Sequence, residues 1–300
     1  MTARLRRSEL AVPASSEKMI RKAAASDADL VFLDLEDAVA PPGKRDAREQ
    51  AIRFLNELDW GRKVRAVRVN DALSPWAHDD VIEVVTRAGH NLDVLILPKV
   101  KAPRDVWFFE TLLAQLEAKL GRGFGIGFEV LVEEAEALGR VEELAACSPR
   151  LEALILGFGD LAASLGFRHG HVEDPAHAYP GDPWHHARAR LVAAARAHGL
   201  EAIDGPYPFI GDTDGYHLQA VWASTLGATG KWAVHPSQIA PANEVFSPTA
   251  QEIETARNMC DAYEHSAGSA AAQGSLVDAA TARLFGAVLH RADLISERVS

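Results

Sequence analysis

The sequence predicts a (β/α)8 barrel followed by a C-terminal α-helical extension. Eight short apolar runs rich in Val, Ile and Leu alternate with amphipathic segments over about 235 residues, the size of such a barrel. Polar residues gather after many of these runs, whereas an open doubly wound sheet, the alternative, would concentrate them at one switch point. The expected strands lie at 10–13, 29–35, 64–69, 93–97, 126–132, 153–157, 201–204 and 231–234.

The segments between these runs have helical periodicity and charged faces. The clearest are Lys44–Leu58, Ala77–Ala88, Arg104–Leu120 and His185–His198. Continuous apolar strands alternating with amphipathic helices indicate a parallel sheet that helices cover. No internal repeat is evident beyond this alternation.

The pattern changes after residue 245, so we expect a barrel domain over residues 1–245 and an extension over 246–300. Thr249 and the glutamates at 252 and 254 predict the start of a helix from Ala250 to His265. Residues 266–274 are small and predict a flexible linker. A final helix is expected over Asp278–Ile295.

Composition and charge exclude several classes of protein. The formal net charge of -11 argues against a general nucleic-acid binder, because no basic surplus exists to displace counterions. Cys147 and Cys260 are too few for a disulfide framework. No run approaches the roughly 20 apolar residues of a membrane helix, and no apolar signal segment follows the basic start. These features favour a soluble, cytoplasmic enzyme with no nucleic-acid or membrane partner.

Two carboxylates, Glu133 and Asp160, stand just past the ends of expected strands, and Arg68 stands at the end of a third. The carboxyl ends of barrel strands converge on one face, so these groups are expected to surround one small acidic substrate. Two hard oxygen ligands suit a divalent metal, above all Mg²⁺, which keeps positions open for substrate oxygens. The alternative is that both acids merely cap the helices that follow.

Further charged groups follow the second and fourth expected strands. The second ends in Asp34-Leu-Glu36-Asp37, and three clustered acids need cations, for which Arg68, Lys44 and Arg48 are candidates. Glu36 and Asp37 then support Arg68 or metal-bound water, or Asp37 caps a helix. Lys99 follows the fourth strand, where a Schiff base ranks low because nearby acids should raise its pKa.

Two other stretches resemble known binding motifs but lack their spacing or position. The glycine-rich stretch Gly121–Gly127 precedes a strand, whereas a dinucleotide-binding loop follows one. The histidine-rich stretch 169–186 lacks the HExxH spacing of a zinc helix and is interpreted as a substrate lid at the barrel mouth.

Seven ordered motifs span nearly the whole chain and resemble those of the citrate lyase β-subunit/malyl-CoA lyase family, within the HpcH/HpaI aldolase superfamily. Tyr179–Trp184, Asp204–Tyr207 and Ser74–Trp76 resemble the malyl-CoA/β-methylmalyl-CoA lyase branch more closely than true citrate lyase β-subunits. The motifs are Arg7-Ser-x-Leu-x-Val-Pro13, Asp34-Leu-Glu-Asp-Ala-Val39, Arg68-Val-Asn70, Leu97-Pro-Lys-Val100, Leu131-Val-Glu133, Gly157-x-Gly-Asp160-Leu and Gly230-Lys231-x-x-Val-His235-Pro236-x-Gln238.

The resemblance implies a TIM barrel, Mg²⁺ (with Mn²⁺ as an alternative ion), acyl-CoA thioester and small oxo-acid substrates, and a homotrimer or hexamer. It implies that Glu133 and Asp160 are the metal ligands, and that Arg68 contacts a substrate oxygen. Glu36 and Asp37 match supporting acids. Arg7 and Lys231 match candidate contacts for the CoA phosphates or the architecture of the site.

The segment Gly274–Asp278 resembles the family segment whose aspartate is the acid/base group reaching a neighbouring subunit's site. Leu276 and Ala279 replace the Met and Pro that the family often has there. Glu134 also departs from the family, which often has Glu-Thr-Ala at 133–135, and it either changes metal affinity or faces solvent.

These assignments imply reversible cleavage of a β-hydroxyacyl-CoA thioester, such as malyl-CoA or β-methylmalyl-CoA, to glyoxylate and acetyl- or propionyl-CoA. Backbone N–H groups around Gly159, Asp160 and Leu161 are expected to hold the free carboxylate, and Asp278 to protonate the enolate carbon. The alternatives are a malyl-CoA thioesterase or malate-synthase-like enzyme, and a citryl-CoA lyase or carrier-dependent citrate lyase β-subunit.

Overall fold

Eight parallel strands form a closed barrel in chain order, with β1 paired to β8, in a computed structural model that describes residues 4–167, 181–266, 269–272 and 275–299. This confirms the predicted (β/α)8 barrel, and each observed strand overlaps its expected range. The strands are β1 (Ser8–Pro13), β2 (Leu30–Asp34), β3 (Val64–Arg68), β4 (Val94–Leu97), β5 (Gly127–Val132), β6 (Leu151–Leu156), β7 (Glu201–Asp204) and β8 (Gly230–Ala233).

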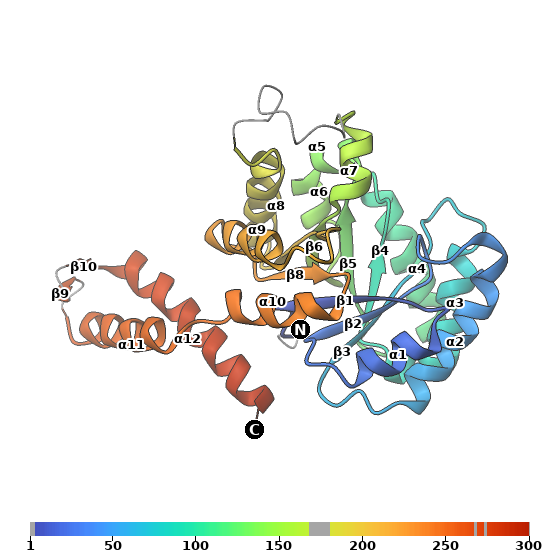
Figure 1. The fold of residues 1–300 in the computed structure, drawn as a ribbon, viewed down its shortest axis with the longest axis horizontal. Helices are drawn as coiled ribbons and strands as arrows, with labels where there is room; N and C mark the ends of the chain where they lie inside the picture. The colour runs from blue at the N-terminus through green and yellow to red at the C-terminus, as the bar shows by residue number, and fades with distance from the viewer. Residues whose placement is uncertain (1–3, 168–180, 267–268, 273–274, 300) are drawn as a thin grey trace.

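Helices surround the barrel and pack on its outer surface (Figure 1). The four helices with the clearest periodicity lie within two residues of their expected bounds, because a strong amphipathic pattern fixes the buried face. The helices of the barrel are α1 (Glu17–Ala24), α2 (Lys44–Glu57), α3 (Ala77–Ala88), α4 (Pro103–Leu120), α5 (Ala135–Gly139), α6 (Val141–Ala145), α7 (Phe158–Ser164), α8 (His185–Ala197), α9 (Thr213–Thr225) and α10 (Ile239–Val245).

The hydrophobic core has two parts. The larger lies between the strands and the surrounding helices, and the smaller fills the inside of the barrel. Leu30, Phe32, Ala66, Ile96 and Trp232 belong to the inner cluster and are at most 4% exposed. The barrel is therefore packed inside, and a substrate pocket can open only at a rim.

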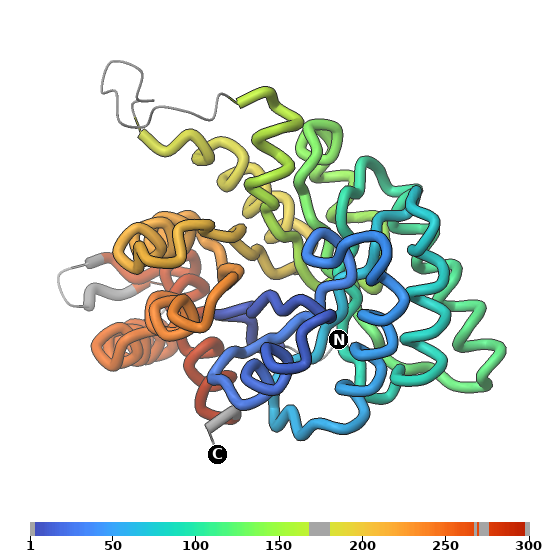
Figure 2. Tube along the Cα trace, turned by 45° about the vertical axis from the view of Figure 1, so that its right-hand side comes forward, coloured from blue at the N-terminus to red at the C-terminus, as the bar shows by residue number. Residues whose placement is uncertain are grey.

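A C-terminal arm extends away from the barrel on the left of Figures 1 and 2. It comprises α11 (Ala250–Glu264), the strands β9 (Ala270–Ala272) and β10 (Ser275–Val277), and α12 (Ala279–Val299). Thr249 caps α11 in a capping box with Glu252, as expected. The prediction of a flexible linker over 266–274 was wrong in part, because β9 pairs antiparallel with β10.

The predicted domain boundary at 245/246 coincides with the end of α10. Among the described residues, no helix is both long enough and apolar enough to cross a membrane. Most of the histidine-rich stretch interpreted as a lid, residues 168–180, lies outside the described residues.

Candidate active site

A pocket of about 440 Å³ opens at the carboxyl ends of the strands. It brings together Arg68, Glu133 and Asp160, of which the first and the last lie 92 positions apart in the sequence. Its remaining lining residues are Ala11, Val12, Pro13, Met19, Asp34, Asp37, Ala38, Leu131, Gly157, Gly159, Pro206, Trp232 and Val234.

Glu133 directly follows β5 and is held in a fixed position at the pocket wall. Its Oε1 accepts a hydrogen bond of 2.7 Å from the backbone N–H of Lys99, and its side chain is 2% exposed. A Cβ on Gly157 would lie only 2.5 Å from the Cβ of Glu133, so glycine is required beside it. Burial, opposed by the Lys99 N–H and by Arg68, raises the pKa of Glu133 to about 8, and the charge of Asp160 adds to the rise.

Asp160 lies in the first turn of α7, one turn past the end of β6. Gly159 and Asp160 both line the pocket, and the first N–H groups of a helix have no acceptor within the helix. Leu161 differs from the expectation, because its N–H donates to the carbonyl of Gly157 at 3.1 Å and its side chain is fully buried. Of the three expected substrate contacts, Gly159 and Asp160 are thus available and Leu161 is not.

Arg68 ends β3 and is fixed by two carboxylates from the end of β2. Its Nε and Nη2 donate to the two oxygens of Asp34 at 2.7 and 2.6 Å, and Nη1 lies 3.1 Å from Glu36. Sequence reasoning placed Asp34 in the acid cluster but gave it no role. Asp34 orients the Arg68 guanidinium because the parallel register of β2 and β3 sets the two residues opposite each other. Only the strand pairing reveals this contact.

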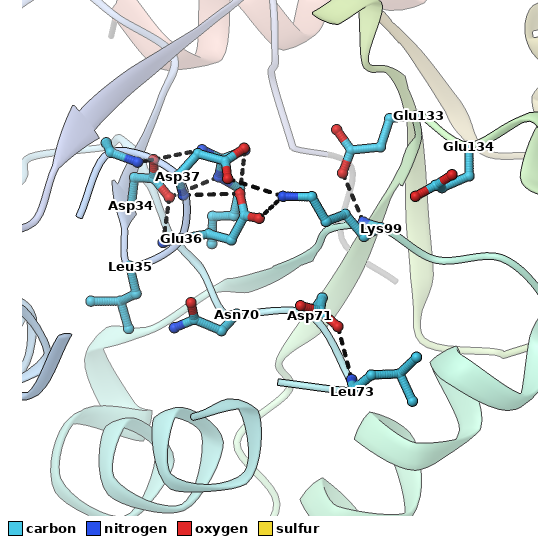
Figure 3. Close-up of polar contacts among 12 residues, drawn as sticks. Asp34, Leu35, Glu36, Asp37, Asn70, Asp71, Leu73, Lys99, Glu133 and Glu134 are labelled. Atoms are coloured by element: carbon cyan, nitrogen blue, oxygen red, sulfur yellow. Dashed lines mark hydrogen bonds and ion pairs between the residues drawn. The ribbon is translucent and has the colours of Figure 1, made fainter. Parts of the chain in front are cut away.

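Lys99 joins the acids of β2 to Glu133 (Figure 3). Its Nζ contacts Glu36 and lies 3.0 Å from Asp37, while its backbone N–H binds Glu133. Although burial works to lower it, these acids raise the pKa of Lys99, as the sequence predicted, which keeps the amine charged and argues against a Schiff-base nucleophile. Among the described non-glycine residues, Lys99 alone has a positive φ, 51°.

The other expected cations act differently. Lys44 donates to the carbonyls of Leu35 and Glu36 and to Asn70, each at 2.7 Å, and so holds the backbone of the acid segment. The expectation that Arg48 neutralises this cluster was wrong, because its guanidinium pairs with Asp80 and Glu83 on α3.

The charges at the pocket fit a divalent cation. Five carboxylates and three cations lie in or beside the pocket, so two negative charges are uncompensated once Glu133 has lost its proton. The carboxylates are Asp34, Glu36, Asp37, Glu133 and Asp160, and the cations are Lys44, Arg68 and Lys99. Within the described chain no cluster of three or more His, Cys, Asp or Glu forms a ready metal cage. Mg²⁺ needs none, because it commonly takes one or two carboxylates and completes its shell with water and substrate.

Arg7 and Lys231 lie away from this pocket. Arg7 precedes β1, at the opposite rim, where its guanidinium forms a two-point contact with Asp29 at 2.8 and 2.9 Å. Lys231 is fully buried, and its Nζ donates to Asp204 at 2.6 Å and to the carbonyl of Gly205 at 2.7 Å. Both contacts support the architectural role and leave no charge free for a phosphate.

Asp278 lies at the start of α12, on the arm, and does not line the pocket of its own chain. Its Oδ1 accepts hydrogen bonds from the N–H groups of Ala280 and Thr281 and from the Thr281 hydroxyl. Thr281 in particular lowers the pKa of Asp278, which is therefore a carboxylate at neutral pH.

The side chain of Glu134 contacts residues outside the pocket. Its Oε2 accepts a hydrogen bond of 3.0 Å from Ser164, and Lys101 lies 3.8 Å from Oε1. This favours a local structural role for the extra carboxylate over a role as metal ligand.

Residues 7–236 match the model of a family described as HpcH/HpaI aldolase/citrate lyase. The chain belongs to this family. It is 40% identical over 98% of its length, and 96% of the relative's, to L-malyl-CoA/beta-methylmalyl-CoA lyase of Cereibacter sphaeroides. A (3S)-malyl-CoA thioesterase of the same species is 35% identical, covering 91% of this chain and 89% of its own.

The chain is also similar to solved structures. The CitE protein of Mycobacterium tuberculosis, in complex with magnesium, acetoacetate and coenzyme A, superimposes with a TM-score of 0.76 at 28% identity, over 95% of this chain and 97% of that one. The expected resemblance to citrate lyase β/malyl-CoA lyases and the expected lyase class are confirmed.

Proposed function

We propose that the protein is a Mg²⁺-dependent carbon–carbon lyase that cleaves and forms malyl-CoA or β-methylmalyl-CoA. The observation that carries this proposal is the convergence of Glu133, Asp160 and Arg68 on one pocket of a member of this family. The overall identity to malyl-CoA/beta-methylmalyl-CoA lyases supports the choice of substrate.

Glu133 and Asp160 hold the metal in this proposal. Bound Mg²⁺ would supply Lewis-acid polarisation of the hydroxyl and carboxylate oxygens of the malyl unit. Glu133 is preorganised for this task by Lys99 and Gly157, so little side-chain entropy is lost on binding.

Arg68 stabilises negative charge on the thioester oxygen as the enolate develops. Asp34 and Glu36 fix its guanidinium, so the charge is already oriented before the reaction begins. One preorganised contact of this kind is worth roughly 3–4 kcal/mol of transition-state stabilisation. The N–H groups of Gly159 and Asp160 bind the substrate carboxylate, as the dipole of α7 favours.

Asp278 transfers the proton at the enolate carbon, from an arm of a neighbouring subunit in a trimer or hexamer. Its absence from the lining of its own pocket and its ionised state support this role: a carboxylate removes the proton of acetyl-CoA in condensation and returns it in cleavage. Mn²⁺ as an alternative ion and a cytoplasmic location stay predictions from the sequence.

A product assay tests the proposal. Purified full-length protein is incubated with Mg²⁺, glyoxylate and acetyl-CoA or propionyl-CoA, and the products are identified by mass. We expect malyl-CoA or β-methylmalyl-CoA, and the release of glyoxylate in the reverse direction. Free CoA as the main product would favour the thioesterase alternative, which the 35% identical relative supports. Turnover of citryl-CoA alone would favour the citrate lyase alternative.

Asp160→Asn is the matched test of the metal site. We expect it to abolish Mg²⁺-dependent cleavage while the melting temperature stays near that of the wild type, because the amide keeps the size of the carboxylate. Near-normal turnover in this variant would remove Asp160 from the ligand set.

A further inference from the structure

A buried layer of charge lies inside the barrel, below the pocket. Glu9 on β1 and Glu129 on β5 are both 0% exposed, and Arg6 is 3% exposed. The charged groups facing Glu9 and Glu129 are Arg4, Arg6 and Glu152. The neighbouring strands β2, β3, β4 and β7 contribute apolar side chains to the barrel interior: Phe32, Ala66, Ile96 and Ile203.

One oxygen of each buried carboxyl has a hydrogen-bond donor. Glu129 Oε1 accepts a hydrogen bond of 2.6 Å from Arg6 Nε, and Glu9 Oε2 accepts one of 2.8 Å from the indole N–H of Trp232. The other oxygens, Glu9 Oε1 and Glu129 Oε2, are buried and have no hydrogen-bond partner among the described residues. Two unpaired carboxylate oxygens in an apolar interior are too costly to leave ionised and unsatisfied.

A single shared proton resolves this cost. The layer contains three carboxylates, Glu9, Glu129 and Glu152, against two guanidinium groups, so one added proton balances it. Asp93 is paired with Arg65 at 2.9 Å and reaches Arg4 only at 3.9 Å. Burial first, and then the charge of Glu129, raises the pKa of Glu9 well above that of an ordinary glutamate.

Trp232 connects this layer to the pocket above it. Its N–H binds Glu9 below, its ring lies 4.5 Å from Phe32, and the Cζ of Arg68 lies 5.6 Å from its centroid. Trp232 also lines the pocket, although it is only 4% exposed. The indole therefore separates the buried carboxyls from the guanidinium that faces the substrate.

We infer that Trp232 is a positioning residue for Arg68, and that a Glu9–Glu129 pair sharing one proton holds its indole from below. With the proton in place, Glu9 donates to Glu129 through one oxygen and accepts from Trp232 through the other. The indole is then fixed in one orientation, and its face supports the Arg68 guanidinium. This inference rests on the proposed function for its kinetic readout, but the proton itself is testable without any substrate.

The first test is Trp232→Phe, which keeps an aromatic ring at this position but removes the indole N–H together with the second ring. In the full-length enzyme we expect kcat to fall roughly tenfold, the effect of losing one hydrogen bond to a buried acid. The Michaelis constant and the Mg²⁺ dissociation constant should stay within about twofold, because neither Glu133 nor Asp160 is touched. An unchanged kcat, or equal losses in Mg²⁺ binding, would overturn the positioning role.

The second test compares Glu9→Gln with Glu9→Ala, and needs no activity. Gln mimics the protonated acid: its amide donates to Glu129 and its oxygen accepts from Trp232. Native Glu9 keeps a proton that an unfolded glutamate loses above pH 4.5, so the wild type should lose stability, relative to Glu9→Gln, as the pH rises. We expect the melting-temperature gap in favour of Glu9→Gln to widen with pH, while Glu9→Ala is destabilised throughout.

Infrared spectroscopy provides an independent readout of the same proton. At neutral pH the difference spectrum of the wild type minus Glu9→Gln should contain the C=O stretch of a protonated carboxyl, because any proton on Glu133 is common to both proteins and cancels. If the band is absent from this difference spectrum, or if Glu9→Gln and Glu9→Ala are equally unstable at every pH, the shared proton is refuted. If the wild type has no lyase activity but the band and the pH trend appear, the proposed function fails and the carboxyl pair stands.

Discussion

Binding of Mg²⁺ should be linked to release of a proton from Glu133. Burial raises the pKa of this carboxyl to about 8, and the nearby charge of Asp160 contributes to the rise. A protonated carboxyl is a poor ligand, so the metal must displace the proton. At pH 7, roughly nine in ten metal-free molecules would carry it.

The expected size of the effect follows from this difference in pKa. The apparent Mg²⁺ affinity should rise about tenfold per pH unit, or about 1.4 kcal/mol, between pH 6 and 7, and should level off above pH 8. Metal-free protein should show the opposite trend in stability. The folded state retains a proton that unfolded Glu133 loses above pH 4.5, so stability falls as the pH rises toward 8.

Titration calorimetry at several pH values, in buffers of different ionisation enthalpy, measures both the affinity and the protons released. Glu133→Gln is the matched control, in which Mg²⁺ binding should be weaker and independent of pH. Asp160→Asn, where weak binding is still measurable, should move the pH dependence to lower pH, because one source of the raised pKa is gone. An affinity for Mg²⁺ that stays constant from pH 6 to 8 in the wild type would show that metal binding displaces no proton from Glu133.

Three further substitutions test the geometry. Arg68→Lys cannot reproduce the two-point contact with Asp34, so kcat should fall by roughly 10²–10³ in a steady-state assay with little change in Mg²⁺ affinity, and a smaller effect would argue against a preorganised guanidinium. Gly157→Ala places a methyl group against Glu133, so we expect a loss of about 1–3 kcal/mol in the free energy of unfolding, together with weaker Mg²⁺ binding. Asp278→Ala should abolish turnover but leave Mg²⁺ binding unchanged in calorimetry; full turnover would exclude it as the proton-transfer group.

The barrel could be predicted from the sequence because its signals are local. Each strand is an apolar run that both cores bury, and helices such as Ala77–Ala88 repeat their apolar residues at the helical period. The hairpin of β9 and β10 was missed because residues 266–274 are small and have no strand alternation. Its pairing depends on the neighbouring strand rather than on local propensity.

The site could be predicted only in part, because strand ends show which residues meet but not which atoms bind. Glu133, Asp160 and Arg68 do share a pocket, as the position of each after a strand indicates. The Asp34–Arg68 pair depends on register, and the engagement of Leu161 depends on where α7 begins. Each needs a precision of one residue, which composition and periodicity do not provide.

The position of Asp278 on the projecting arm makes catalysis, under the proposed mechanism, a property of the assembly rather than of one chain. Dilution that separates the subunits would abolish the activity of every barrel, although each barrel would still bind its metal ion. Two dead variants, one lacking Asp160 and the other lacking Asp278, would recover turnover when their subunits are exchanged, since an intact barrel can then meet an intact arm.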